Sequence, residues 1–305
     1  MPSLMQVREL SKSYGNHLSI HNINFDIEKG HCVALLGPNG AGKTTTLRMM
    51  AGLLAPTSGS INFEGAAPGS DYRKQLGYLP QSPSFYGWMS GEEYLVFAAK
   101  LSGLGSQEAV KRAAEVLARV GLKEAARRRI AGYSGGMKQR LGLAQALVHH
   151  PRLLLLDEPV SALDPIGRRE VMEMLREIRE ETTIIFSTHV LHDAEEICDD
   201  IILLNKGEIA EQGTLAELRS TYRIPVIRLQ VEKQEAALNW LQSITSKSYV
   251  TESQVSGQDA AFNVNDIVEA RREIIQEAAA LGIPLLHFEA GSSTLEDLFM
   301  KVVGS

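Results

Sequence analysis

Short apolar runs alternate with helix-length amphipathic stretches along the first two thirds of the chain. The runs at 32–36 (CVALL), 153–156 (LLLL) and 183–188 (TIIFST) are mainly apolar and have the length of strands. Helical patterns cover residues 43–51 and about 166–181. Near-continuous apolar strands that alternate with helices are typical of a parallel sheet covered on both faces. The pattern therefore predicts an α/β core.

Two other segments have the pattern of antiparallel strands. Apolar and polar residues alternate over 18–27, which predicts strands with a break near His21 and Asn22. The sequence IILLNKGEIAEQG at 201–213 predicts a hairpin that turns at Lys206 and the glycine after it. Both segments place antiparallel pairing beside the parallel core.

A mainly helical region separates the early strands from the run at 153–156. Residues 90–149 carry helical periodicity, and we place a helical subdomain at about 82–150. Ser90 and Glu93 have the spacing of a capping box, in which each side chain bonds the other residue's backbone N–H. We therefore expect a helix to begin directly after Ser90.

The pattern changes near residue 220, where we place the boundary between a domain at 1–220 and a second domain at 221–305. The predicted elements beyond it are a strand (224–231), a helix (233–243), two strands (near 248–254 and 260–265), a helix (267–281) and a strand (284–288). The order βαββαβ suits a small ferredoxin-like α+β domain. A last helix is predicted in the sequence TLEDLFMKVV.

Composition narrows the class of protein. Hydrophobic residues make up 44% of the 305 residues and charged residues 22%, which is typical of a soluble globular protein. The net charge of −6 and the pI near 5.8 argue against nucleic acid as a partner. The first residues contain no apolar core of a signal peptide, and no apolar run approaches the roughly 20 residues of a membrane span. Cys32 and Cys198 are expected to be buried thiols in a reducing compartment.

A phosphate-binding loop follows the first buried strand. Its residues match G-x-x-x-x-G-K-[ST] and are Gly37, Pro38, Asn39, Gly40, Ala41, Gly42, Lys43 and Thr44, with Thr45 next in the helix. Such a loop curls its backbone N–H groups around phosphates, its lysine contacts the β and γ oxygens, and its threonine hydroxyl can ligate Mg²⁺. We expect ATP and Mg²⁺ to bind here.

A second acidic motif ends the strand at 153–156. Asp157 and Glu158 follow four leucines directly. A carboxylate at the end of a strand beside a P-loop is placed to hold magnesium, and Glu158 is placed to polarise the attacking water. An ordinary acidic turn after a core strand has the same sequence pattern, but the P-loop favours the catalytic interpretation.

The sequence YSGGM at 133–137 opens a helix and is a candidate second anion site. The hydroxyl of Ser134 and the N–H groups of Gly135 and Gly136 are the candidate donors. Taken alone, the same residues favour an ordinary serine N-cap over an anion site.

Taken together and in this order, the motifs resemble those of the nucleotide-binding subunits of ATP-binding cassette (ABC) transporters. The resemblance covers residues 4–219, and YSGGM corresponds to the family's Leu-Ser-Gly-Gly-Gln signature. Tyr133 and Met137 depart from that signature, which affects packing and a ribose contact more than phosphate binding. The resemblance implies a P-loop NTPase core with an antiparallel β subdomain and an α-helical subdomain.

The resemblance also implies roles for individual residues. It implies that adenine stacks on Tyr14, that Gln81 senses Mg²⁺ and the attacking water, and that His189 contacts the γ-phosphate. The segment from Ser161 to Asp164 matches the one that crosses the family's dimer interface. The residues expected to act in hydrolysis are therefore Glu158, His189, Lys43 and Gln81, with Thr44, Gln81 and Asp157 around the metal ion.

Partners follow from the same resemblance. Two copies are expected to pair head to tail as a homodimer, each signature closing on the other copy's ATP. Phe85, Tyr86 and Trp88 are expected to receive a helix from a separate permease subunit at the inner face of the cell membrane. The C-terminal extension resembles those of bacterial exporters. The alternatives are a soluble ABC-type ATPase with a non-transport partner and a non-catalytic module that uses ATP as a dimer switch.

Overall fold

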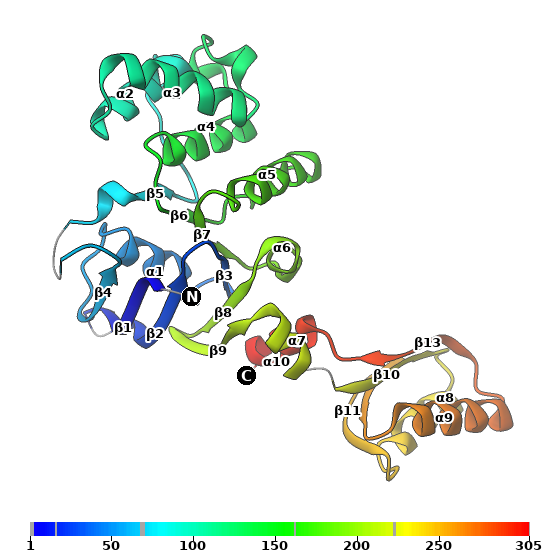
Figure 1. Ribbon diagram of the computed structural model, residues 1–305. Coiled ribbons are helices and arrows are strands. Elements are labelled where there is room, and N and C mark those ends of the chain that lie inside the picture. Colours follow the sequence, from blue (N-terminus) through cyan, green and yellow to red (C-terminus); the bar gives the residue numbers. More distant parts are fainter. Residues whose placement is uncertain (1–2, 16, 68–70, 162, 222–223, 305) are drawn as a thin grey trace. The chain divides into compact units, whose positions relative to one another are not determined.

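The continuous apolar runs form the inner strands of a central sheet (Figure 1). This computed structural model describes residues 3–15, 17–67, 71–161, 163–221 and 224–304. Within them the sheet has six strands in the order β5-β6-β7-β3-β8-β9. Their bounds are β3 (Cys32–Leu36), β5 (Leu76–Leu79), β6 (Leu153–Asp157), β7 (Thr183–Thr188), β8 (Asp200–Asn205) and β9 (Glu208–Thr214). The predicted α/β core is confirmed.

The strands β5, β6, β7, β3 and β8 run parallel, and β9 returns antiparallel to β8 at one edge of the sheet. The predicted hairpin at 201–213 is thus confirmed, with Lys206 in the left-handed region at its turn. Both cysteines are buried thiols: Cys32 begins β3 and Cys198 lies shortly before β8, and their Sγ atoms lie 3.6 Å apart.

A second, antiparallel sheet packs against the helix α1 (Lys43–Met50) through one hydrophobic core that also reaches the central sheet. The sheet has the order β2-β1-β4 among the described residues. Its strands are β1 (Ser3–Tyr14), β2 (His17–Glu28) and β4 (Ser58–Phe63). The predicted break near His21 is wrong, because β2 continues through it. Asn22 takes a φ of 49°, and the pairing shifts register nearby, so a bulge absorbs the irregularity.

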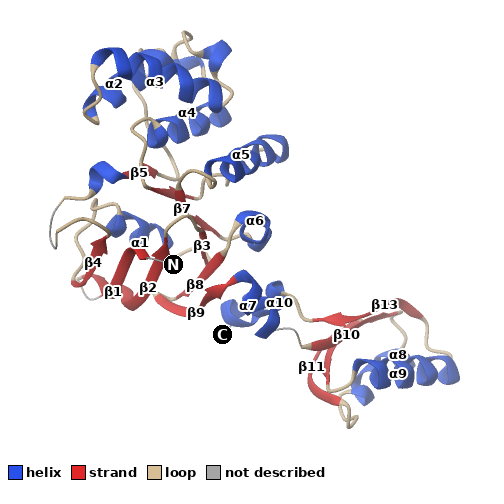
Figure 2. Cartoon of the chain, viewed as in Figure 1, coloured by secondary structure: helices blue, strands red, loops and turns tan. Residues whose placement is uncertain are grey.

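The region between β5 and β6 folds into helices joined by loops (Figure 2). Its helices are α2 (Gly91–Leu101), α3 (Ser106–Arg119) and α4 (Gly135–Leu147), with the short 3₁₀ turns η2 (Lys123–Ala125) and η3 (Ile130–Gly132) between α3 and α4. A further 3₁₀ turn, η1 (Arg73–Gln75), directly precedes β5. The capping box is confirmed, since the Glu93 N–H donates to Ser90 Oγ at 3.2 Å and the Ser90 N–H to Glu93 Oε2 at 2.8 Å. Beyond β6 lie α5 (Pro165–Ile178) and α6 (Leu191–Ile197).

His149, directly after α4, gives this region a predicted pH dependence. Its Nε2 lies 2.9 Å from the Leu76 carbonyl oxygen, and burial lowers the pKa of its imidazole. Below about pH 6.5 the unfolded chain gains a proton that folded His149 resists, so stability falls on acidification. We expect the melting temperature of His149→Gln to fall less between pH 7.5 and pH 5 than that of the parental protein. The control is His17→Gln, at an exposed histidine of β2 outside the groups whose charges act on His149; an unchanged slope in His149→Gln would contradict this reasoning.

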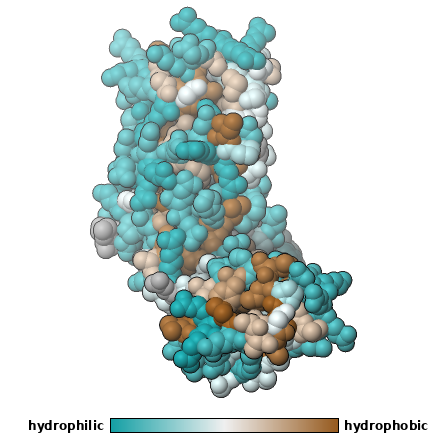
Figure 3. Space-filling view, turned by 90° about the vertical axis from the view of Figure 1, so that its right-hand side faces the viewer, coloured by the Kyte–Doolittle hydropathy of each residue, from teal (hydrophilic) through white to brown (hydrophobic). Residues whose placement is uncertain are grey.

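The chain divides into two compact units, residues 1–215 and 216–305, which are described separately. In the second unit the sheet has the order β11-β12-β10-β13, all antiparallel, as in a ferredoxin-like split sheet. Its elements are α7 (Leu215–Thr221), β10 (Pro225–Val231), α8 (Glu235–Ile244), β11 (Val250–Ser256), β12 (Asp259–Val264), α9 (Ile267–Leu281), β13 (Leu285–Ser292) and α10 (Leu295–Gly304). Trp240 and Phe262 lie in its own core. Figure 3 shows hydrophobic surface on this unit, where Val268 is 62% exposed.

Candidate functional site

The carboxyl ends of four parallel strands bring the predicted site residues to one edge of the central sheet. Leu36 of β3 pairs with Thr188 of β7, and Asp157 of β6 pairs with Ser187. Because parallel strands in register end together, the loops that follow them meet at that edge. The residues that these strand ends present are Gly37–Thr44 after β3, Gln81 after β5, Asp157 and Glu158 at β6, and His189 after β7.

The P-loop depends on glycines at two crowded positions. A Cβ at Gly37 would lie 2.2 Å from the Leu204 carbonyl oxygen, so no larger residue fits. Gly42 has a φ of 106°, which only glycine adopts readily, and a Cβ there would lie 2.3 Å from Ile20 Cδ1. Gly42 is the N-cap of α1, so the loop leads into a helix N-terminus, where backbone N–H groups favour an anion.

Lys43 is a buried cation at the start of α1. Its Nζ donates to the carbonyl oxygens of Gly37 at 2.7 Å and Pro38 at 3.0 Å, which hold the ammonium over its own loop. It lies 3.8 Å from Glu158 Oε1. Burial lowers the pKa of Lys43, and the carboxylates of Glu158 and Asp157 oppose that shift. A positive charge is thus held against the phosphate-binding loop.

Glu158 is held by contacts on both its side chain and its backbone. Gln81 Nε2 donates to Glu158 Oε2 at 3.3 Å, and His189 Nδ1 lies 3.3 Å from Glu158 Oε1. The backbone has a φ of 46°, a left-handed conformation that costs a non-glycine residue about 1–2 kcal/mol. The structure therefore brings Gln81, Glu158 and His189 together, and strain of this kind is common at functional sites.

Asp157 has the surroundings of a metal ligand. Its Oδ1 accepts from Thr44 Oγ1 at 3.1 Å and from Ser187 Oγ at 2.7 Å. Its Oδ2 is buried and has no hydrogen-bond partner within the described part of the chain. A buried carboxylate oxygen without a donor is costly unless a cation binds it. Thr44 and Asp157 therefore fit the oxygen ligands that Mg²⁺ prefers.

Tyr14 lies at the end of β1, and its side chain is 50% exposed. The ammonium of Lys12 lies 5.2 Å from the centre of the Tyr14 ring and also donates to the Ala55 carbonyl oxygen at 2.8 Å. A cation over one face steadies the ring. Thr45, the other P-loop residue predicted to contact nucleotide, is half-buried in α1, and Ser19 Oγ lies 3.4 Å from its hydroxyl.

The signature segment begins α4 in the helical region. Ser134 is its N-cap, and its Oγ accepts from the Met137 N–H at 3.2 Å. Gly135 is exposed and Gly136 half-buried. Tyr133, which departs from the family's leucine, is buried and donates its hydroxyl to the Ala125 carbonyl oxygen at 2.7 Å. The buried Tyr133 therefore anchors the segment to the helical region, while the serine and glycines stay at the surface.

The segment from Ser161 to Asp164 connects β6 to α5. Asp164 is the N-cap of α5, and its Oδ1 accepts from the Gly167 N–H at 2.8 Å. Ser161 Oγ donates to the Glu158 carbonyl oxygen at 3.2 Å. Ala162 lies outside the described residues. This segment starts from the candidate catalytic glutamate and ends at a helix N-terminus.

Three polar residues that make contacts around the site were not found from the sequence. Ser187 bonds Asp157, as described above. Gln139 of α4 donates to the Pro159 carbonyl oxygen at 2.9 Å, which ties the signature helix to the loop after Glu158. Asp193, only 1% exposed, accepts from Arg168 of α5 and from Thr188. A polar residue inside an apolar strand or helix face was the available signal for each.

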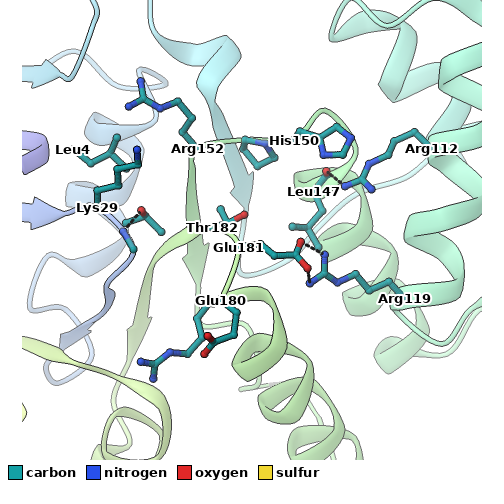
Figure 4. A pocket seen from close by; sticks show the side chains of 14 residues that line it. Leu4, Lys29, Arg112, Arg119, Leu147, His150, Arg152, Glu180, Glu181 and Thr182 are labelled. Carbon is teal, nitrogen blue, oxygen red and sulfur yellow. Dashed lines mark hydrogen bonds and ion pairs between the residues drawn. The ribbon is translucent and has the colours of Figure 1, made fainter.

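A cavity of about 680 Å³ opens elsewhere, where Gly30, Arg152 and Thr183 mark the amino ends of β3, β6 and β7 (Figure 4). The arginine side chains that line it have protein partners. Arg119 of α3 makes two bonds to Glu181, at 2.8 and 3.2 Å, and Arg112 donates to carbonyl oxygens at the end of α4. The charges thus connect the helical region to the core, and the phosphate-binding features lie at the opposite edge of the sheet.

Comparison with known proteins identifies the family. The ABC transporter family matches residues 20–161, and the C-terminal domain of DrrA1-3-like ATP-binding proteins matches residues 213–303. The uncharacterized ABC transporter ATP-binding protein YxlF of Bacillus subtilis is 48% identical over 301 residues, which are 98% of this chain and 99% of that protein. The chain belongs to the ATP-binding subunits of ABC transporters.

Two further comparisons of this ABC subunit concern transport and assembly. The bacitracin transport ATP-binding protein BcrA of Enterococcus faecalis is 35% identical, with 100% of this chain and 97% of that protein covered. The dimeric cassette MJ0796, solved in a post-hydrolysis state with ADP and Pi, has a TM-score of 0.64 and 26% identity, with 69% of this chain and 98% of that chain covered. This chain is an ATPase, and ATP is its substrate.

Proposed function

We propose that this ABC subunit energises export through a separate membrane-spanning subunit, and that two copies do so by closing head to tail around ATP. The observation that carries the proposal is the pair of anion-binding features within one chain. Lys43 and its loop lie at the edge of the central sheet, whereas Ser134 and Gly135 begin α4 at the surface of the helical region. A second copy uses the surface feature as the other half of its own site.

We assign the chemistry to residues that surround the P-loop. Transfer of a phosphoryl group to water depends on positioning and charge neutralisation more than on covalent catalysis. Lys43 supplies a fixed positive charge against the phosphate oxygens. Glu158 orients or deprotonates the attacking water, and its contacts with Gln81 and His189 hold the carboxylate for that task. His189 is 44% exposed at its side chain, so it can face the substrate while it contacts Glu158.

Magnesium is the metal ion that we propose for this site. Thr44 and Asp157 would hold it, with Gln81 beside them. When bound, Mg²⁺ neutralises charge on the phosphate oxygens. The protein's own contribution is to orient Asp157: two hydroxyl groups occupy Oδ1, and Oδ2 is left for the ion.

We propose a homodimer as the active assembly, because one chain carries both halves of the site. Ser161 and Asp164 would lie at the interface, in a segment that is bonded to the backbone of Glu158. Contacts across the dimer would therefore act directly on the loop that carries the catalytic glutamate. The dimeric state of the MJ0796 cassette supports this arrangement.

An exposed aromatic groove is the proposed docking site for the permease. A hollow of about 480 Å³ is lined by Tyr86, Phe97 and Leu101, among others. Trp88 beside it is 71% exposed, and its ring centre lies 6.1 Å from that of Tyr86. Phe85 instead packs edge-on against Tyr94, with ring centres 5.1 Å apart, so it serves the local core. Exposed apolar side chains of this size are typical of a protein interface.

Truncation of this groove should separate transport from hydrolysis. We expect Trp88→Ala together with Phe97→Ala to lower transport about tenfold, since aromatic residues dominate interface energies, while basal ATPase activity stays within about twofold. The control is Val110→Ala, a truncation of a 49% exposed side chain on α3 that lies outside the groove. Equal loss of transport and basal ATPase activity in a folded variant would contradict the docking role.

We base the proposed class of transported substrate on the names of two relatives. BcrA is named for bacitracin transport and LnrL of B. subtilis for linearmycin resistance, which supports export of an antibiotic by this protein too. Within the described residues no helix has the length and hydrophobicity of a membrane span. We therefore propose that the chain is held at the inner face of the cell membrane by its permease.

Reconstitution tests the proposed function. The chain would be co-expressed with a candidate permease subunit from the same genome, purified in detergent and placed in liposomes. We expect ATP-dependent movement of a bacitracin-class peptide, with ATPase activity stimulated by that peptide. A chain that hydrolyses ATP fully but neither binds the membrane protein nor responds to it would favour the soluble ATPase instead.

A further inference from the structure

Ser187 lies between the two carboxylate residues of the site. It belongs to β7, which pairs in parallel with β6, and the register sets Ser187 opposite Asp157. Its side chain is fully buried. Ser187 Oγ donates to Asp157 Oδ1 at 2.7 Å and accepts from the Glu158 N–H at 2.9 Å. A single hydroxyl thus contacts the side chain of one residue and the backbone of the next.

The direction of these bonds is determined by chemistry. A backbone N–H can only donate and an ionised carboxylate can only accept, so the Ser187 proton must point to Asp157. The two hydrogen bonds are therefore consecutive: the Glu158 N–H donates to Ser187, and the Ser187 hydroxyl donates to Asp157. A hydrogen bond to a carboxylate is stronger than one between neutral groups, and linked bonds polarise one another.

These two hydrogen bonds affect both carboxylate residues of the site. At Asp157, the Ser187 and Thr44 hydroxyls fix the rotation of the carboxylate and leave Oδ2 without a donor. At Glu158, the bond holds a backbone whose φ is 46°. That conformation directs the glutamate side chain toward Gln81 and His189.

We propose that Ser187 is a positioning residue that couples the orientation of the metal ligand Asp157 to that of the water-activating Glu158. The inference rests on the roles proposed above for those two carboxylates. Ser187 touches neither the substrate nor the ion. If the Asp157 carboxylate rotates, Ser187 moves with it and shifts the Glu158 backbone. The orientations of the metal ligand Asp157 and of the base Glu158 are therefore linked.

The same strand provides a control for a merely structural hydroxyl. Thr183, at the other end of β7, is also buried, and its Oγ1 accepts from the Gly30 N–H at 2.8 Å. Thr183→Val removes that bond at almost constant volume and far from the carboxylates along the strand. Ser187→Ala removes the bonds to Asp157 and Glu158. Ser187→Cys keeps the size with a weak donor and acceptor, and Ser187→Thr keeps the hydroxyl.

The experiment measures metal binding and turnover separately in the full-length protein. Mn²⁺ is titrated in the presence of a non-hydrolysable ATP analogue, and free Mn²⁺ is followed by electron paramagnetic resonance. We expect Ser187→Ala to weaken Mn²⁺ binding several-fold and to lower kcat about tenfold, with KM for ATP within about twofold. Ser187→Cys should lie between Ser187→Ala and the parental protein, and Ser187→Thr should recover most of both losses. Thr183→Val should change neither quantity, although it lowers the melting temperature.

Two results would overturn the inference. One is parental Mn²⁺ affinity and kcat in a folded Ser187→Ala or Ser187→Cys protein. The other is an equal loss in Thr183→Val, which would make the effect one of general stability. Asp157→Asn and Glu158→Gln are measured alongside. If those two variants keep parental metal binding and turnover, the proposed roles of the carboxylates fail, whereas loss in them with no loss at Ser187 removes only the present inference.

Discussion

Glu158→Gln should slow ATP hydrolysis by about 10²-fold or more while leaving ATP binding nearly unchanged. A positioned general base contributes roughly 10²–10⁴ in rate, and glutamine cannot accept the proton of the attacking water. The substitution is nearly isosteric, so the contact with Gln81 and the P-loop geometry should persist. Because bound ATP is no longer consumed, two copies should stay closed around it. Size-exclusion chromatography with ATP should therefore show a stable dimer.

The control for this variant is Glu177→Gln, which removes the same charge from an exposed position on α5. It should keep parental turnover and should not trap a dimer. Parental turnover in Glu158→Gln would show that another group activates the water. Slow turnover without an ATP-dependent dimer would instead separate catalysis from assembly and contradict the proposed cycle.

Two inactive variants should restore each other's activity when they are mixed. Lys43→Ala removes the P-loop cation, and Gly136→Asp puts a negative charge where the signature meets phosphate; each homodimer should lose about 10²-fold in rate. In a mixed dimer, one site combines both defects and the other combines two intact halves. If the subunits exchange freely and the sites turn over independently, an equal mixture should reach about a quarter of parental ATPase activity, because about half of the pairs are mixed.

This recovery depends on a site built from two chains. If the signature served the P-loop of its own chain, every protomer would stay defective and the mixture would stay inactive. The measurement needs pre-incubation with ATP and EDTA so that subunits exchange before Mg²⁺ is added. A mixture of Lys43→Ala with Glu158→Gln is the control, because both defects lie in the same half of the site and no intact site forms.

Much of the fold was readable from local pattern. The apolar runs became β3, β6 and β7, and the βαββαβ order of the second unit was predicted element by element, with the helix at Ile267–Leu281 at its predicted bounds. These features could be predicted because hydrophobic periodicity and helix capping involve side chains only a few residues apart in the sequence. The prediction failed at His21, where a bulge in β2 keeps the strand continuous through pairing with β1. Such pairing is formed with residues distant in the chain.

The chemistry that we propose for the site could be predicted from the sequence, because the P-loop, the Asp157-Glu158 pair and the Ser-Gly-Gly segment are each short, consecutive motifs. The contacts that hold these motifs in place became visible only in the folded chain. Ser187 reaches Asp157 because two strands share a register, and Trp88 is exposed while Phe85 packs inward because of what surrounds each ring. The chemistry of a motif comes from residues that are neighbours in the sequence, whereas strand register and side-chain exposure arise when distant segments pack together.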